Sequence, residues 1–166
     1  TVPTAMSALM QRKVNADIST LRLAFCGSAP LPLELYRRFE EAAGVTICEG
    51  YGLTEATCLV SINPPNGEKR VGSIGLPFPY TEVKIMSAAT GTELGVDEIG
   101  EICISNPGVS GGETYTEVAK NADLFYPGAD GKPEYLRTGD LGRKDVDGYL
   151  WITGRAKDLI IRGGHN

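Results

Sequence analysis

The sequence has one histidine, His165, and no Cys-x-x-Cys pair, so a structural zinc cluster lacks its usual ligand spacing. Its cysteines are Cys26, Cys48, Cys58 and Cys103. All but Cys58 lie in strand-like apolar stretches, where a buried structural cysteine is the commoner role and a catalytic thiol the rarer alternative. We therefore interpret the cysteines as reduced thiols of a cytoplasmic protein.

Long apolar runs and an excess of basic residues are also absent. Of the 166 residues, 42% are apolar and 22% are charged, as in a soluble globular protein, and no apolar run could span a bilayer. The 16 Lys and Arg residues stand against 21 Asp and Glu, giving a net charge of −5. A protein that binds phosphate backbones gathers basic residues on one face, so we expect neither a membrane segment nor a nucleic-acid partner.

The start of the chain has no initiator methionine, basic segment or apolar leader, which predicts that it carries no secretory signal. Residues 163–166 are turn-like, and turns connect elements. We therefore expect the chain to be a piece of a longer protein, although its length would suffice for one domain.

A short helix and a strand are predicted first. Thr4 is a candidate cap for the helix, and the residues after it that show helical spacing are Met6, Leu9, Met10 and Lys13-Val14. An alternation of Leu21, Leu23 and Phe25 then indicates a half-buried strand, which stops at residues 27–30.

A second helix and a second strand follow. Pro32 suits the first turn of the helix, Gly44 ends it, and its apolar stripe is Leu35, Tyr36, Phe39 and Ala43. Residues Val45–Glu49 then indicate a strand. Strand, helix and strand with short connections predict a parallel βαβ unit, whose loops Gly27–Leu31 and Gly50–Thr57 lie at the carboxyl ends of the strands.

The chain becomes rich in β-type runs from about Arg70 onward. These runs are Val83–Met86, Ile99–Ser105, Tyr135–Thr138 and Tyr149–Thr153, separated by Gly, Asp and Pro turns. We expect them to form a small, distorted β-barrel. Asp147-Gly148 is predicted to be a two-residue hairpin turn after Arg143–Val146, and Ser105–Asp130 is the longest irregular stretch.

The segment Gly50–Glu55 follows a strand and combines groups that suit a nucleotide phosphate with a metal ion. Tyr51 can stack on a purine, Thr54 can hydrogen-bond a phosphoryl oxygen, and Glu55 can hold Mg²⁺. Glycines beside them permit close backbone approach. The structural alternative is a glycine-rich turn in which Thr54 and Glu55 only cap the next segment.

Two further segments place a charge beside glycine. In Arg137–Asp140 the carboxylate of Asp140 can accept hydrogen bonds from both hydroxyls of a ribose, and in Gly154–Ile160 Arg155 offers a planar fork to phosphate or ribose oxygens. Taken alone, each segment could be a surface turn. The combination of all three segments in this order favours a nucleotide site.

Together with Gly27–Pro30, these segments resemble the motifs of the adenylate-forming enzyme superfamily, in its acyl-CoA synthetase branch. The resemblance covers nearly the whole chain and implies an α/β fold. Residues 1–70 would end the α/β subdomain of the large AMP-binding domain, and residues 71–156 would be the distorted β-barrel. Residues 157–166 would be the hinge and the start of a small domain.

The resemblance implies that a carboxylic acid attacks the α-phosphorus of ATP, that pyrophosphate leaves, and that coenzyme A then takes the acyl group. Thr54, Glu55 and the hinge residue Lys157 would serve catalysis, with Mg²⁺ on Glu55. ATP or AMP would contact Gly27, Ser28, Ala29, Pro30, Gly50, Tyr51, Gly52, Thr54, Asp140 and Arg155.

The acyl group would lie against Gly50, Thr57, Cys58, Ile74, Gly75 and Leu76. These positions are uncharged, which favours a fatty or aromatic acid over an amino acid, whose ammonium group needs a partner. Transfer of the acyl group to a carrier protein and a noncatalytic nucleotide-binding module remain open as alternatives. The family's phosphate loop and distal lysine have no counterpart in this sequence, so we expect the chain by itself to be inactive.

Overall fold

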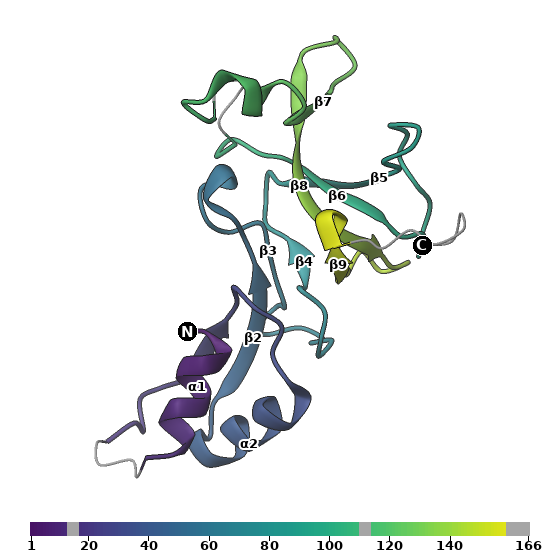
Figure 1. Cartoon of the computed structure of the whole chain (residues 1–166). Coiled ribbons are helices and arrows are strands. Elements are labelled where there is room, and N and C mark those ends of the chain that lie inside the picture. Colours follow the sequence, from purple (N-terminus) through teal and green to yellow (C-terminus); the bar gives the residue numbers. More distant parts are fainter. Residues whose placement is uncertain (13–16, 110–113, 159–166) are drawn as a thin grey trace.

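The computed structural model describes residues 1–12, 17–109 and 114–158. Within them the chain forms a four-stranded and a five-stranded β-sheet. Helices α1 (Pro3–Met10) and α2 (Leu33–Ala43) lie beside the first sheet, at the end of the molecule away from the second (Figure 1). The predicted α/β class is confirmed. No helix among the described residues is long and apolar enough to cross a membrane.

Helix α1 begins two residues earlier than a cap at Thr4 would place it. The extended residue Val2 precedes it, and Pro3 occupies its first turn, where a fixed φ and a missing N–H are tolerated. Thr4 therefore lies inside the first turn, and the prediction that it caps the helix was wrong. Met6 is fully buried in the cluster that α1 shares with α2. The predicted continuation at Lys13-Val14 lies outside the described residues.

The predicted βαβ unit is present. Strands β1 (Leu23–Cys26) and β2 (Thr46–Tyr51) pair in parallel, and α2 connects them. Tyr36 and Phe39 of α2 are buried, as its apolar stripe predicted. Parallel strands end at the same edge of a sheet, so the loops that follow β1 and β2 lie side by side.

The buried face of β1 is the opposite of the one that the alternation suggested. Phe25 is 52% exposed and Leu21 is 45% exposed, whereas Cys26 is only 3% exposed. Cys26 and Ala24 share one face of the strand, and that face packs into the same cluster as the buried residues of both helices. Among the described residues no such cluster covers the face that carries Phe25.

Two short strands, which the sequence pattern did not reveal, extend the first sheet. Strand β3 (Ser61–Ile62) pairs antiparallel with β2, and β4 (Leu76–Pro77) pairs antiparallel with β3. The sheet order is therefore β1-β2-β3-β4. Two-residue strands show no periodicity, so residue spacing could not predict them.

The second sheet contains β5 (Glu82–Met86), β6 (Gly100–Ser105), β7 (Phe125–Pro127), β8 (Pro133–Lys144) and β9 (Leu150–Arg155). β8 pairs with β6 along one side, and with β7 and then β9 along the other. All neighbours are antiparallel. In the described part of the chain this sheet stays open, so it does not form the closed barrel that the term distorted β-barrel suggests. β7 and the short helix Val118–Asn121 lie in the stretch expected to be irregular.

The hairpin between β8 and β9 is present, but its turn is wider than predicted. Gly148 adopts a positive φ of 87°, whereas Asp147 does not. The Asp145 N–H donates to the Tyr149 carbonyl at 3.0 Å and the Gly148 N–H donates to the Asp145 carbonyl at 3.0 Å, so three residues, 146–148, lie between the paired residues and the prediction of a two-residue turn was wrong. Arg70 lies in the connection between β3 and β4 and binds this turn. Its guanidinium is 2.7 Å from the carboxylate of Asp145 and 2.6 Å from that of Asp147.

The backbone of Ser73–Gly75 joins the two sheets at their edges. The Ile74 N–H donates to the Leu150 carbonyl at 2.9 Å, and the Leu150 N–H donates to the Gly75 carbonyl at 2.9 Å. The hydroxyl of the fully buried Ser73 also donates to the Leu150 carbonyl, at 2.8 Å. β9 is therefore fixed to the segment that leads into β4, which sets the position of one sheet relative to the other.

We predict that Gly75→Ala strongly destabilises the protein. Gly75 has a φ of +82°, and an added Cβ would lie 1.9 Å from the carbonyl carbon of Ile62. Gly131 has a similar φ of +77° with open space around it, so Gly131→Ala is the matched control. Urea unfolding should show a loss of about 1–2 kcal/mol for the control and about 3 kcal/mol or more for Gly75→Ala. Equal losses would contradict the close approach at Gly75.

Candidate functional site

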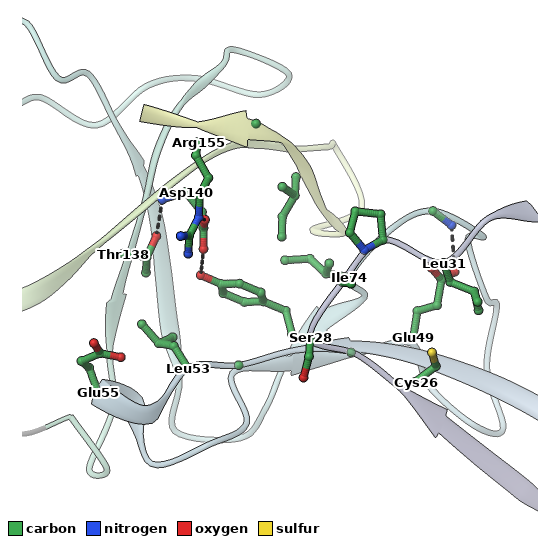
Figure 2. A pocket seen from close by; sticks show the side chains of 18 of the residues that line it. Cys26, Ser28, Leu31, Glu49, Leu53, Glu55, Ile74, Thr138, Asp140 and Arg155 are labelled. Atoms are coloured by element: carbon green, nitrogen blue, oxygen red, sulfur yellow. Dashed lines mark hydrogen bonds and ion pairs between the residues drawn. The ribbon is translucent and has the colours of Figure 1, made fainter. Parts of the chain in front are cut away.

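A cavity of about 670 Å³ lies between the two sheets, where the loops after β1 and β2 face β8 and β9. It is elongated: Asp140 and Arg155 lie at one end and Glu49 and Leu31 at the other (Figure 2). Many of the residues singled out in the sequence line it. They are Ser28, Ala29, Pro30, Gly50, Tyr51, Gly52, Glu55, Ile74, Asp140 and Arg155.

Asp140 is the centre of the polar end. The Tyr51 hydroxyl donates to Oδ2 of Asp140 at 2.5 Å, and Nε of Arg155 donates to Oδ1 at 2.8 Å. Asp140 is only 7% exposed, whereas the Arg155 side chain is 68% exposed. Burial, together with the hydrogen bond to Asp140, raises the pKa of Tyr51, so its hydroxyl stays a neutral donor. Three segments far apart in the sequence thus meet at one carboxylate.

An irregularity in β8 brings Asp140 to this position. Arg137 pairs with Cys103 and Leu141 pairs with Glu101, so residues 138–140 of β8 face only Ile102 of β6. Such a bulge bends a strand and redirects its side chains. On its other side Asp140 is the cross-strand partner of Arg155, which explains why these two side chains meet.

The loop after β1 forms another wall of the cavity. Ser28 has a φ of +67°, an uncommon conformation for a residue other than glycine, and Ala29 and Pro30 follow it along the cavity. A Cβ added to Gly27 would lie 2.8 Å from the Gly50 carbonyl oxygen, so this loop touches the start of the Gly50–Glu55 segment. The loop Gly27–Pro30 and the segment that carries Tyr51 are therefore neighbours.

Glu55 is the candidate metal ligand. It lies on a single helical turn, Thr54–Ala56, and the Tyr115 hydroxyl donates to its Oε1. This hydrogen bond, aided by burial, raises the pKa of Tyr115. Among the described residues no three His, Cys, Asp or Glu side chains gather to hold a metal. One carboxylate fits Mg²⁺, which usually takes its other ligands from substrate phosphates and water.

Several of the predicted residues do not line this cavity. Thr54 is exposed beside it, Gly27 and Gly75 adjoin lining residues in the sequence without lining it themselves, and Leu76 does not line it either. Thr57 and Cys58 lie on a separate surface groove with Phe78 and Asn106. Lys157 is exposed on the turn Ala156–Asp158, and the residues after it lie outside the described part. Their roles stay predictions.

Glu49 is a cavity residue that the sequence reasoning missed. Its Oε2 accepts a hydrogen bond from the Gly72 N–H at 2.9 Å, and burial raises its pKa. Its position at the end of the predicted strand Val45–Glu49, directly before Gly50, was the available signal. The other lining residues, to which the sequence analysis assigned no role in the site, are Cys26, Leu31, Leu53, Gly72, Tyr115, Leu124, Arg137, Thr138, Ile152 and Gly154. Tyr115 carried no signal, because it lies in the irregular stretch.

Comparison with known proteins identifies the family. The sequence model described as AMP-binding enzyme matches residues 1–112. The chain belongs to the AMP-binding enzymes, in their acyl-CoA synthetase branch. It is 41% identical over 99% of its length to marinolic acid–CoA ligase of Pseudoalteromonas sp., covering 25% of that protein. It is 37% identical over 90% of its length to long-chain-fatty-acid–CoA ligase of Bacillus subtilis, covering 26%.

A solved relative extends the comparison to the fold. Anthranilate CoA ligase AuaEII in complex with anthranoyl-AMP superimposes with a TM-score of 0.82 at 31% identity. The match covers 99% of this chain and 30% of that one. The chain therefore spans about a quarter to a third of the length of the AMP-binding enzymes it matches.

We predict that Glu49→Gln stabilises the protein at pH 7. Because burial raises the folded-state pKa of Glu49, ionisation opposes folding. The stability that the protonated carboxyl contributes is present below its ordinary pKa of 4.5 and is lost as the pH rises through the folded-state value. Glutamine mimics the protonated form and can still accept from Gly72.

In urea unfolding, the free energy of unfolding of Glu49→Gln should therefore be higher than that of the wild type at pH 7. The two free energies should become equal at about pH 4. Glu98→Gln is the control, because Glu98 is an exposed carboxylate that also accepts one backbone N–H, from Gly95. A Glu49→Gln protein less stable than the wild type at pH 7 would contradict the assignment.

Proposed function

We propose that the chain forms the adenylate-binding part of an ATP-dependent, AMP-forming acyl-CoA synthetase. The observation that carries the proposal is Asp140, held in the cavity by Tyr51 of one segment and Arg155 of another. The similarity to CoA ligases supports it.

Asp140 would hold the ribose of the nucleotide. Within the described part of the chain, each oxygen of its carboxylate accepts one side-chain hydrogen bond, from Tyr51 or Arg155, and a carboxylate oxygen can accept a second. The carboxylate can therefore accept from two ribose hydroxyls without losing its protein partners. The adenine would lie between the loop Ser28–Pro30 and the ring of Tyr51, which both line the cavity.

The first half-reaction would be attack of the substrate carboxylate on the α-phosphorus of ATP, with pyrophosphate as leaving group. Arg155 is a permanent cation next to Asp140 and would steady the ribose or the α-phosphate, and the exposed hydroxyl of Thr54 would donate to a phosphoryl oxygen. Glu55 would hold Mg²⁺, which neutralises charge on the phosphate oxygens. These groups act by positioning and by electrostatic stabilisation.

The acid would be fatty or aromatic. Part of the cavity wall is apolar, which suits an apolar acyl group. The apolar lining residues include Leu31, Leu53, Ile74 and Ile152. The acids in the names of the relatives, marinolic, long-chain fatty and anthranilic, support this class. Coenzyme A would accept the acyl group in the second half-reaction, and a carrier-protein thiol is the alternative acceptor.

Residues 157–166 would connect this part to a small domain. Lys157 lies directly after Arg155-Ala156, so a rotation there would move the following segment past the cavity. Such a movement would let one site serve both half-reactions. The large domain would contribute residues 1–70 and 71–156.

We predict that Asp140→Ala in the intact enzyme weakens the binding of ATP and of an acyl-adenylate analogue together. The lost hydrogen bonds to a charged group are worth about 1.5–3 kcal/mol. Asp147→Ala is the control, because Asp147 is exposed on the β8–β9 turn and pairs with Arg70. Calorimetry measures both affinities, and acid-dependent pyrophosphate release measures the reaction.

Unchanged affinities would mean that Asp140 has only a structural role in β8. An intact wild-type enzyme that releases no pyrophosphate with any fatty or aromatic acid would contradict the proposed reaction.

A further inference from the structure

Glu101 is a buried carboxylate on β6 that does not line the cavity. The residue is 3% exposed, and its two oxygens have different partners on β8. Oε1 accepts a hydrogen bond from the Gly139 N–H at 3.1 Å. Oε2 accepts from Nε of Arg137 at 3.0 Å and lies 2.9 Å from its Nη2. Glu101 thus contacts residues on either side of Thr138, inside the bulge that carries Asp140.

The bulge explains what Glu101 does there. Residues 138–140 of β8 face only Ile102 of β6, so the regular ladder cannot supply a partner for every N–H in this stretch. An unpaired backbone N–H away from water is costly, and Oε1 of Glu101 satisfies that of Gly139. The Thr138 hydroxyl accepts from the Asp140 N–H at 3.1 Å and donates to the Ile102 carbonyl at 2.8 Å.

The charge of Glu101 is matched by Arg137. A buried carboxylate needs a cation and further donors, and the guanidinium of Arg137 supplies both. The same guanidinium stacks over the ring of Tyr126 at 4.7 Å, and its Nη1 donates to the Asp123 carbonyl at 3.3 Å. Arg137 also lines the cavity, so Glu101 binds one cavity residue directly and, through the Gly139 N–H, the residue that precedes the cavity residue Asp140.

We infer that Glu101 is a positioning residue for ribose recognition, acting through Gly139 and Arg137 to hold Asp140 in the cavity. The inference rests on the proposed function, because it assigns the ribose to Asp140. It predicts that the loss of Glu101 weakens the contribution of the ribose hydroxyls to nucleotide affinity. The contribution of the rest of the nucleotide should change less.

The test compares ATP with 2′,3′-dideoxy-ATP, which lacks both hydroxyls, by calorimetry on the intact enzyme. The wild type should prefer ATP by about tenfold to a hundredfold, as expected for hydrogen bonds to a charged group. E101A should lose most of this preference. E101Q should fall between them, because its amide oxygen can still accept from Gly139 but cannot neutralise Arg137. The double variant E101A/D140A should show the same preference for ATP as D140A alone, because both substitutions act on the same contact between Asp140 and the ribose.

Glu82→Ala is the matched control. Glu82 is a carboxylate on β5 of the same sheet that accepts from the Tyr135 hydroxyl at 2.9 Å, away from the cavity, and its loss should leave the preference unchanged. E101A and E101Q proteins that keep the wild-type preference overturn the inference, even if urea unfolding shows lower stability. If E101A does not fold, the isosteric E101Q decides, and a preference within about twofold of the wild type overturns the inference.

The failure of the proposed function would look different. A wild-type enzyme that binds ATP and 2′,3′-dideoxy-ATP equally would overturn the assignment of the ribose to Asp140 before any variant is compared. A wild type with the expected preference, lost in D140A but kept in both Glu101 variants, would overturn only the positioning role.

Discussion

The hydrogen bonds between Ser73–Gly75 and Leu150 determine whether this chain has a site at all. One wall of the cavity belongs to the loops after β1 and β2, and the other belongs to β8 and β9, in a different sheet. The Leu150 carbonyl accepts from both the Ile74 N–H and the hydroxyl of the buried Ser73, so backbone and side chain together fix the contact. A shift at this junction would separate Tyr51 from Asp140, because these residues lie on opposite sides of it.

The second constraint is the bulge in β8. In a regular antiparallel ladder, residues 138–140 would each face a partner on β6, and their N–H groups would be used within the sheet. Here the Gly139 N–H bonds to the Glu101 side chain and the Asp140 N–H bonds to the Thr138 hydroxyl, and Asp140 reaches the cavity between Tyr51 and Arg155. Two side-chain hydrogen bonds to the backbone of the bulge would therefore decide how well the ribose carboxylate is placed.

The sequence predicted those helices and strands whose apolar residues show a clear period, and those site residues that lie within short motifs. α2 and the parallel pairing of β1 with β2 followed from apolar spacing and turn residues, and Tyr51, Asp140 and Arg155 stood out beside glycines. β3 and β4 are too short to show a period, and the buried face of β1 depends on which side the helices pack. Glu101 could not be found, since its importance comes from the register between β6 and β8 and not from its neighbours in the sequence.

The most direct test of the account is a crystal structure of the intact enzyme with a non-hydrolysable acyl-adenylate analogue. The account predicts that both ribose hydroxyls donate to the carboxylate of Asp140, with Tyr51 and Arg155 still bonded to it and the adenine beside Ser28–Pro30. An analogue bound elsewhere, or a ribose held by other groups while Asp140 pairs only with Tyr51 and Arg155, would contradict it.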